Sequence, residues 1–372
     1  MDEQAAQLIL INAPALSGAK YLSLLAQHGT AAGVIQAGPS AWRAAELSPR
    51  CCEFLSATTS TSVATQQRWL DHPSHHLIML DDSRYPELLQ QLPDPPVGLF
   101  VSGNPAVLKR PQLAMVGSRN PSPYGRQIAA AFAKHLSGCG LSITSGLAAG
   151  IDAASHRGAL AGGGATLAVC GTGLDTIYPR SSEALAREIE ATGALISEFP
   201  PGTPPRKHHF PQRNRLISGL SLGTLVVEAA LHSGSLITAR LAGDQGREVF
   251  AIPGSIHSPM SKGCHQLIRQ GAKLVDDAAD ILSELGPLAA SLTNLTAINN
   301  TELIDLSGFS HALLDKDYKI LLDALGFEPL SVDQLVLRSG LPADAVISML
   351  LILELDGCIE CFPGGLYLRA QK

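Results

Sequence analysis

A run of cationic and aromatic residues at 206–215 carries the clearest chemical signal in this sequence. It reads Arg-Lys-His-His-Phe-Pro-Gln-Arg-Asn-Arg and contains no carboxylate. Four fixed positive charges lie within it: Arg206, Lys207, Arg213 and Arg215. The nearest acids outside are Glu198 and Glu228, so we expect nothing to neutralise these charges. Such a window favours a polyanion, and Phe210 offers a flat face to an unstacked base. A solvated basic loop with Phe210 in the core is the alternative.

Glycines and hydroxyl residues gather in four turns that each follow a predicted strand. The turns contain Gly117-Ser118-Arg119, Ser145-Gly146 with Gly150, Gly171-Thr172-Gly173, and Ser233-Gly234-Ser235. Glycine lets the backbone approach a ligand, hydroxyls donate hydrogen bonds, and the start of the next helix attracts an anion. In an open parallel sheet such turns share one edge, where ligands bind. Simple closure of tight turns is the alternative for any one of them.

The elements that must position these turns follow an α/β pattern. Short apolar runs alternate with helical segments at 113–116, 141–144, 166–169, 194–197, 224–228 and 249–252. Short apolar strands that alternate with helices predict a largely parallel sheet covered on both faces.

Helical patterns flank this central region on both sides. Residues 5–70 show helical spacing broken by Gly and Pro, which predicts a small bundle of short helices. The polar stretch 291–301 predicts a linker. Helical patterns at 317–326, 331–338 and 342–356 precede a predicted β-hairpin around Pro363-Gly364-Gly365. Three helices and a hairpin indicate a winged helix, although its acidity argues against DNA reading.

Composition and charge narrow the class of protein. The chain has 372 residues, 45% of them hydrophobic, and a net charge of −6, which is typical of a globular protein with two or three domains. Residues 276–372 are strongly acidic, so we expect a polyanion to bind residues 1–275, which carry a small positive excess. Without an apolar run of about 20 residues or a secretory signal, the sequence predicts a cytoplasmic protein with no membrane contact.

Metal and disulfide signals are weak. Seven cysteines, an odd number, do not indicate a secreted disulfide framework. Cys358 and Cys361 form one isolated Cys-x-x-Cys, which we interpret as chance. His72, His75 and His76 also permit a metal interpretation, but we predict that they lie solvated in a linker. We therefore expect no metal and no cofactor.

Signatures of common enzymes are missing from the sequence. It contains no Gly-x-x-x-x-Gly-Lys-Ser/Thr loop, and no Gly-x-Gly-x-x-Gly opens the first helix after the first strand. Asp152 and His156 lie four residues apart on a predicted helix, and Glu228 ends a strand, so catalytic roles are conceivable. An aspartate at a helix start more often caps it, and a helical histidine is more often structural. We therefore expect no enzymatic activity.

An ordered series of motifs resembles the DNA processing protein A (DprA/Smf) family of bacteria. The resemblance covers most of the chain and is densest at 81–275. Its motifs are Tyr85-Pro86 with Leu88, Asp94-Pro95-Pro96, Gly117-Ser118-Arg119, 145–152, 171–175 with Tyr178-Pro179, 210–215, 227–229, 233–239, Gly246-Arg247 and Pro253-Gly254. Two positions depart from the family pattern. Ser182 stands where the family often has asparagine. The segment that is Gly-Asn-x-Leu-Ile in the family reads Gly263-Cys264-His265-Gln266-Leu267-Ile268 in this chain.

The resemblance implies a domain order and a fold. Residues 1–75 would form a helical domain similar to sterile-alpha-motif (SAM-like) or helix-hairpin-helix (HhH-like) domains. Residues 76–290 would form an extended Rossmann-like, mostly parallel sheet that binds DNA. Residues 291–310 would be a linker, and 311–372 a winged helix. The fold class is therefore α/β with a small helical domain at each end.

The same resemblance implies a function and a set of contacts. It implies a homodimer that binds and protects incoming single-stranded DNA and helps load RecA on it during natural transformation and recombination. Arg119 and Lys207 would hold phosphates, and Phe210 would stack on a base or wedge against it. Ser145, Gly146, Arg213 and Arg215 would be neighbouring contacts, and the turn with Gly117 and Ser118 would let the sugar-phosphate backbone lie close.

Two other functions remain open. One is a nucleotide-processing enzyme similar to the cytokinin-activating phosphoribohydrolases, whose Pro-Gly-Gly-x-Gly-Thr loop would correspond to the segment ending in Gly223-Thr224, with Glu228 as its acid. The other is a scaffold that binds RecA through the basic window. Turnover of a nucleoside monophosphate would identify the enzyme, and DNA affinity would separate a DNA binder from the scaffold.

Overall fold

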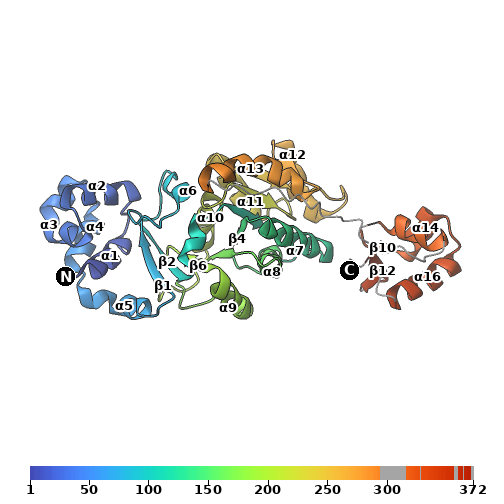
Figure 1. Cartoon of the computed structure of the whole chain (residues 1–372), viewed down its shortest axis with the longest axis horizontal. Coiled ribbons are helices and arrows are strands. Elements are labelled where there is room, and N and C mark those ends of the chain that lie inside the picture. The colour runs from blue at the N-terminus through green and yellow to red at the C-terminus, as the bar shows by residue number, and fades with distance from the viewer. Residues whose placement is uncertain (294–315, 327, 356–358, 363, 370–372) are drawn as a thin grey trace. The chain divides into compact units, whose positions relative to one another are not determined.

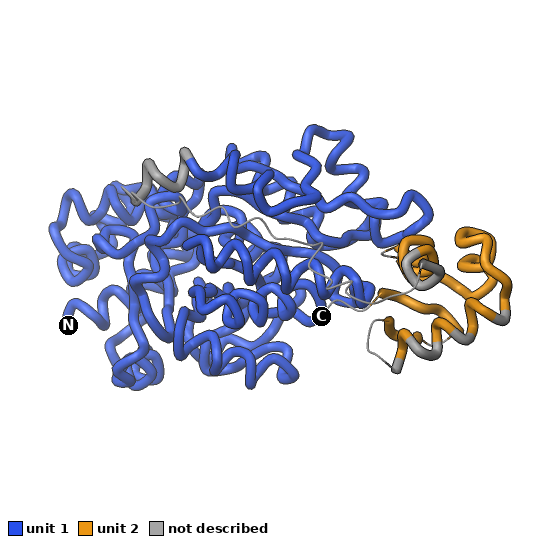
Figure 2. The backbone as a smooth tube through the Cα atoms, turned by 45° about the vertical axis from the view of Figure 1, so that its right-hand side comes forward, with its two compact units in different colours: residues 1–301 blue, residues 302–372 orange. Residues whose placement is uncertain are grey.

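A computed structural model describes residues 1–293, 316–326, 328–355, 359–362 and 364–369. The chain forms two compact units, Met1–Thr301 and Glu302–Lys372, which Figure 2 shows in different colours. Within the described residues, no helix is both long enough and apolar enough to cross a membrane.

The first unit begins with the predicted bundle of short helices. Their bounds are α1 Glu3–Ile11, α2 Gly18–His28, α3 Ala31–Ala44, α4 Pro49–Ala57 and α5 Ala64–Leu70, with the 3-10 turn η1 Ser60–Val63 before α5. Side-chain caps explain where four of them start, since Asp2, Ser17, Thr30 and Ser48 each accept a hydrogen bond from a backbone N–H of the first turn. The apolar core of this bundle continues without a break into the sheet.

A nine-stranded sheet forms the centre of the unit, in the order β1-β2-β6-β5-β4-β3-β7-β8-β9. The strands are β1 His75–Met79, β2 Gly98–Gly103, β3 Gln112–Val116, β4 Ser142–Ser145, β5 Thr166–Val169, β6 Ala194–Ser197, β7 Gly223–Val226, β8 Glu248–Ala251 and β9 Lys273–Leu274. Neighbours from β6 to β9 pair in parallel, whereas β1 with β2 and β2 with β6 pair antiparallel. The six strands predicted from apolar runs are confirmed, as is the mostly parallel sheet.

Helices cover both faces of this sheet. Helices α7 Pro123–Gly138, α8 Ile151–Ala161 and α9 Glu183–Thr192 pack side by side, and α10 His209–Gly219 packs on α11 Ser235–Asp244. Figure 1 shows α8 and α9 on one side of the sheet and α11 with α12 Lys262–Arg269 on the other. The remaining helical elements are η2 Pro105–Lys109, η3 Arg180–Ser182, η4 Pro259–Ser261, α6 Glu87–Gln90 and α13 Ala278–Thr293. Strands buried on both faces, such as β3, explain the continuous apolar runs of the sequence.

Two expectations for the segments around the sheet are wrong. His75 and His76 are not in a solvated linker, because they belong to β1. The ring of His75 stacks on Trp69 with the centroids 3.9 Å apart. At the other end, α13 extends to Thr293, so residues 291–293 of the predicted linker are helical. The rest of that linker, residues 294–310, lies outside the described residues.

The second unit contains the predicted three helices and hairpin. Helices α14 Lys316–Leu325, α15 Val332–Ser339 and α16 Ala343–Leu355 accompany the strands β10 Leu330–Ser331, β11 Ile359–Phe362 and β12 Leu366–Arg369. The order β10-β12-β11 places the hairpin β11–β12 as predicted. Its core contains Leu321, Leu335, Leu350 and Leu353. Ser331 begins α15 with a capping box, and Gly340 ends it in a left-handed conformation with φ 67°.

The Cys-x-x-Cys pair and the histidine cluster were the two candidate metal sites in the sequence. Of the Cys-x-x-Cys pair, Cys358 lies outside the described residues and Cys361 is a free, exposed thiol on β11. Among the residues that the structure describes, no group of three or more His, Cys, Asp or Glu side chains could hold a metal ion.

Candidate nucleic-acid interface

The turns after β3, β4, β5 and β7 all lie at one edge of the sheet, as predicted. These strands run parallel, so their carboxyl ends point the same way. The chain proceeds from β3 to β4 on one side, whereas β7 pairs with β3 on its other side. This is a topological switch point, where the turns that leave two neighbouring strands diverge and open a crevice.

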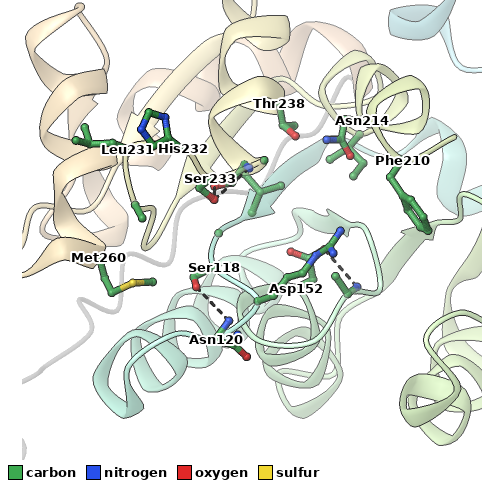
Figure 3. Close-up of a pocket in the computed structure, with 18 of the residues that line it drawn as sticks. Ser118, Asn120, Asp152, Phe210, Asn214, Leu231, His232, Ser233, Thr238 and Met260 are labelled. Atoms are coloured by element: carbon green, nitrogen blue, oxygen red, sulfur yellow. Dashed lines mark hydrogen bonds between the residues drawn. The ribbon is translucent and has the colours of Figure 1, made fainter. Parts of the chain in front are cut away.

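A pocket of about 900 Å³ occupies this crevice (Figure 3). It is lined by the turns after β3 and β7 and by the starts of α8, α10, α11 and α12. Its lining residues are Val116, Gly117, Ser118, Arg119, Asn120, Ala148, Asp152, Phe210, Arg213, Asn214, Ile217, Ala230, Leu231, His232, Ser233, Gly234, Ser235, Thr238, Pro259, Met260 and Lys262. Five of the nine site residues predicted from the sequence line this pocket, and one of them, Arg213, is buried. The other four are Gly117, Ser118, Arg119 and Phe210.

Arg119 and Phe210 meet although 91 positions separate them in the sequence. Arg119 is exposed on the turn after β3, and its Cζ atom lies 6.0 Å from the centroid of the Phe210 ring. That distance fits a weak cation–π contact. Phe210 is half-buried in the first turn of α10, and a Cβ atom added to Gly171 would lie only 3.1 Å from its Cδ1 atom. Glycine after β5 therefore lets the ring sit close to the backbone, and the alternative of a fully buried Phe210 is wrong.

Tyr178 is a neighbour that the sequence analysis did not count among the site residues. Its side chain is 47% exposed, and its ring centroid lies 5.4 Å from that of Phe210, tilted by 42°. The two rings form an aromatic pair at the rim of the pocket. The signal in the sequence was an aromatic residue in the Tyr178-Pro179 motif, but only the fold brings it to Phe210.

Lys207 is not among the residues that line the pocket. It belongs to an exposed turn with Arg206 and His208 directly before α10. The start of a helix carries partial positive charge, which adds to that of these side chains. His209, the first residue of α10, anchors the turn because it is buried, stacks on Phe199 at 4.1 Å and lies 3.2 Å from the carbonyl oxygen of Gly171 through Nδ1.

Gly117 and Ser118 shape the wall of the pocket beside Arg119. A Cβ atom on Gly117 would lie 2.6 Å from Cγ1 of Ile151, so no larger residue fits. The backbone N–H of Ser118 donates to the carbonyl oxygen of Glu228 at 2.8 Å, which ties the turn after β3 to the turn after β7. Its hydroxyl oxygen accepts from the N–H of Asn120 at 3.1 Å.

Arg213 does not present a free charge to the surface. Its side chain is 4% exposed, and Nη1 donates to the carbonyl oxygens of Gly146, at 2.6 Å, and Val169. Asp152 lies nearby and accepts from the N–H groups of Gly146 and Ala148 at 3.2 and 3.3 Å. Burial raises the pKa of Asp152 and lowers that of Arg213, and the charge of each opposes the shift of the other. The expectation that nothing neutralises Arg213 is wrong.

Arg215 is also paired. Its Nη2 donates to a carboxylate oxygen of Glu198, whose side chain is 9% exposed, and Nη1 donates to the carbonyl oxygen of Asp94 at 2.8 Å. Burial raises the pKa of Glu198, and the charge of Arg215 counteracts that shift. The expectation of an unneutralised Arg215 is therefore wrong, and the exposed cations of the basic window are Arg206 and Lys207.

Ser145 and Gly146 lie beneath the pocket surface. Both are buried, and the Ser145 hydroxyl donates to the carbonyl oxygen of Met115 at 2.6 Å. The N–H of Gly146 donates to Asp152, and its carbonyl oxygen accepts from Arg213. These contacts join β4 to β3 and to α10, and DNA contacts from the two residues remain predictions.

The candidate catalytic residues have structural partners. His156 is fully buried, its Nδ1 lies 2.7 Å from the Thr166 hydroxyl, and burial lowers its pKa to about 3. The Glu228 carboxylate accepts from the N–H and hydroxyl of Ser122 at 2.8 and 2.6 Å, at the start of α7. These contacts favour the interpretation of both residues as structural.

The segment compared with a phosphoribohydrolase loop is buried: residues 220–222 form a tight turn after α10, and the strand β7 follows at once. Gly223 and Thr224 are the first residues of β7, and both are buried. A phosphate loop must present its backbone to the ligand, which a buried strand cannot do. No observation on the described residues favours this alternative.

The two departures from the family pattern make contacts inside the fold. The Ser182 hydroxyl is buried and donates to the carbonyl oxygen of Leu147 at 3.0 Å. The Nε2 atom of His265 lies 3.0 Å from the carbonyl oxygen of Gly254.

Comparisons with known proteins agree with the resemblance seen in the motifs. A family model described as DNA recombination-mediator protein A matches residues 76–286, and one for the DprA winged helix domain matches residues 309–365. Protein Smf of Escherichia coli (strain K12) is 46% identical over 312 residues, which cover 84% of this chain and 82% of that protein. DNA processing protein DprA of Streptococcus pneumoniae is 49% identical over 206 residues, which cover 55% of this chain and 72% of that protein.

Solved structures extend the agreement to the fold. The X-ray structure of DprA from Streptococcus pneumoniae matches with a TM-score of 0.67 and 36% identity, covering 76% of this chain and 99% of that one. A Helicobacter pylori DNA processing protein A, described for its single-stranded DNA binding mode, matches with a TM-score of 0.52 and 30% identity, covering 57% of this chain and 96% of that one. The motifs, the sheet with its switch-point pocket and these matches together show that the chain belongs to the DNA processing protein A (DprA/Smf) family of DNA recombination-mediator proteins.

Proposed function

We propose that this protein binds single-stranded DNA at the carboxyl edge of its sheet, without being an enzyme. One observation carries the proposal: Arg119 and Phe210, from distant segments, place an exposed guanidinium 6.0 Å from the centroid of an accessible aromatic ring. A phosphate beside a base requires this combination of a cation and a stacking face. The printed description of the Helicobacter pylori relative concerns single-stranded DNA binding, which supports the same ligand here.

The residues divide into contacts and framework. Arg119 and Lys207 hold phosphates, Phe210 stacks on a base, and Tyr178 extends the stacking face. Gly117 and Ser118 let the sugar-phosphate backbone lie close. Ser145, Gly146, Arg213 and Arg215 hold the turns in place through the hydrogen bonds described above. Stacking and phosphate contacts carry little sequence information, so the protein binds single strands with little sequence preference.

This binding serves recombination in the cytoplasm. The protein protects incoming single strands and helps load RecA on them during natural transformation. Membership of a recombination-mediator family supports this role. Helix α16 takes the position of the recognition helix, but it has no basic residue in its last turn. The whole second unit is acidic. The winged helix therefore contacts protein or stabilises the fold.

An aromatic substitution series at Phe210 tests the proposal. We expect Phe210→Leu to weaken binding of oligothymidine by about 1–3 kcal/mol, because leucine keeps apolar volume but loses the stacking face. Phe210→Trp should bind within about threefold of wild type, because indole stacks at least as well. Fluorescence anisotropy of a labelled oligonucleotide measures both. Equal affinities of wild type and Phe210→Leu would exclude base stacking on this ring.

The protein acts as a homodimer that associates through α11 and β9. Leu231 and Ile237 are exposed and line a groove of about 680 Å³ between α11, α12 and β9, and Leu274 is exposed on β9 itself. Strand β9 ends the sheet, so its outer edge is open to a partner. Apolar side chains beside an open sheet edge are typical of subunit contacts.

A charge placed in this groove should separate the subunits. We expect Ile237→Glu to convert the dimer to a monomer, because the 46% exposed isoleucine would be replaced by a carboxylate that the contact must desolvate. Light scattering coupled to size-exclusion chromatography measures the mass. Leu22→Glu is the matched control, since Leu22 on α2 is a similarly exposed leucine, at 42%. A dimeric Ile237→Glu variant at micromolar concentration would contradict this interface.

A further inference from the structure

The pocket side of the Phe210 ring is the side that a base can reach. Phe210 lines the pocket (Figure 3), as does Arg119. Gly171 and Tyr178 also border the ring, but they are not among the lining residues. A Cβ atom on Gly171 would lie 3.1 and 3.2 Å from Cδ1 and Cε1 of the ring, and the Tyr178 ring lies 5.4 Å away, tilted by 42°. Backbone and a second ring therefore border Phe210 outside the pocket, and the pocket side is left for a base.

Arg119 covers this side of the ring. Its Cζ atom lies over the ring, 6.0 Å from the centroid. A base between the ring and the guanidinium would need about 7 Å, because each of its two contacts takes about 3.5 Å. The space is too small for a base, so Arg119 must move before a base can stack on Phe210.

The ring holds Arg119 only weakly. Arg119 is exposed, and within the part of the chain that the structure describes it forms no ion pair with a carboxylate. A cation–π contact at an exposed site changes an equilibrium constant only about two- to fivefold. A phosphate forms stronger, charge-assisted hydrogen bonds with a guanidinium, so it can draw Arg119 away from the ring.

We propose that Arg119 makes base stacking on Phe210 selective for strands with a charged backbone. This inference rests on the proposed function. The guanidinium covers the ring until a phosphate binds it, and the base beside that phosphate then stacks on Phe210. A ligand that has bases but no backbone charge must displace Arg119 without this compensation. Arg119 therefore discriminates against free bases and other neutral aromatic molecules, in addition to holding a phosphate.

An uncharged analogue of the strand separates the two roles of Arg119. We expect Arg119→Ala to bind methylphosphonate oligothymidine, whose backbone is neutral, about two- to fivefold more tightly than wild type, because the ring is uncovered. The same variant should bind ordinary oligothymidine about tenfold more weakly, since the lost phosphate contact outweighs that gain. Fluorescence anisotropy at low salt measures both affinities. Because Arg119 is exposed, the variant should melt like wild type.

Lys207→Ala is the matched loss of a cation that does not cover the ring. Lys207 is exposed and does not line the pocket. This variant should bind ordinary oligothymidine more weakly and the neutral analogue as wild type does. If Arg119→Ala binds the neutral analogue no more tightly than wild type, Arg119 does not restrict access to Phe210 and the inference is overturned.

Arginine side-chain NMR gives a second readout that does not depend on the weak binding of a neutral strand. A guanidinium over an aromatic ring experiences the ring current, so Phe210→Leu should move the Nε–H signal of Arg119. Arg119→Ala assigns that signal. We expect ordinary oligothymidine to remove the ring-current shift from the wild-type protein. A shift that persists in the complex would show that Arg119 stays over the ring, contrary to the inference.

The outcome for Phe210→Leu separates this inference from the proposed function. If Phe210→Leu and Arg119→Ala both weaken binding of both oligonucleotides, Arg119 does not exclude neutral strands, and the proposed function stands. If neither variant changes the affinity for either oligonucleotide, the proposed function is wrong as well.

Discussion

Replacing Asp152 by alanine should lower the free energy of unfolding of the first unit by about 3–5 kcal/mol, because it leaves the buried Arg213 without a nearby opposite charge. Two effects add. The variant removes the carboxylate whose charge supports Arg213, and it removes the acceptor for the N–H groups of Gly146 and Ala148. Asp152→Asn should cost less, since its amide oxygen can still accept those hydrogen bonds.

Urea unfolding followed by tryptophan fluorescence measures this effect. Both tryptophans of the chain, Trp42 and Trp69, lie in the first unit, so the signal reports on that unit alone. Asp175→Ala is the matched control, because exposed Asp175 also accepts a backbone hydrogen bond in a strand-end loop, from Gly202 at 2.7 Å. We expect the control to cost under about 1.5 kcal/mol. A cost for Asp152→Ala as small as that of Asp175→Ala would contradict the role of the buried pair.

The buried pair also explains why the sequence misled about charge. Counting acids along the chain placed none near 206–215, yet the fold brings Asp152 close to Arg213 and Glu198 onto Arg215. Distance along a chain does not limit Coulomb interactions, which depend on distance in space. Only residues at the exposed start of α10, such as Lys207, kept the free charge that the sequence predicted.

The burial of each strand explains which strands the sequence predicted and which it missed. The strands β3 to β7 were predictable because burial on both faces demands uninterrupted apolar runs. Strand β1 begins with His75 and His76, which are only half-buried at the end of the sheet, so its sequence resembles a linker. Its partner β2 was missed with it, although four of its residues from Leu99 to Ser102 are buried.

The site itself was predictable in its chemistry but not in its composition. Motif spacing indicated that glycine-rich turns would meet at one edge, because parallel strands share their carboxyl ends. Nothing in the spacing could show that Tyr178 lies 5.4 Å from Phe210, or that Ser145 points its hydroxyl into the sheet toward Met115. Those facts depend on side-chain packing between segments far apart in sequence.

The largest loss of DNA affinity is expected when the two exposed cations proposed to hold phosphates are both removed. Arg119→Ala with Lys207→Ala should weaken binding of oligothymidine on the order of a hundredfold at low salt, if each charge-assisted contact contributes about 1.5 kcal/mol. Neither side chain is buried, so the melting temperature should stay near that of wild type. The slope of log K against log salt should fall by about 0.7 for each lost phosphate contact.

A pair of cations at the opposite edge of the sheet controls for charge alone. Lys109 and Arg110 are exposed and lie shortly before β3, which begins at Gln112, whereas Arg119 follows this strand. Removing both changes the net charge of the protein by the same amount, so any effect of long-range attraction should be shared. If Lys109→Ala with Arg110→Ala weakens binding as much as the Arg119 and Lys207 pair, the attraction is diffuse. The carboxyl edge then has no special role, because a bound phosphate must depend on the cations within its reach and not on the total charge.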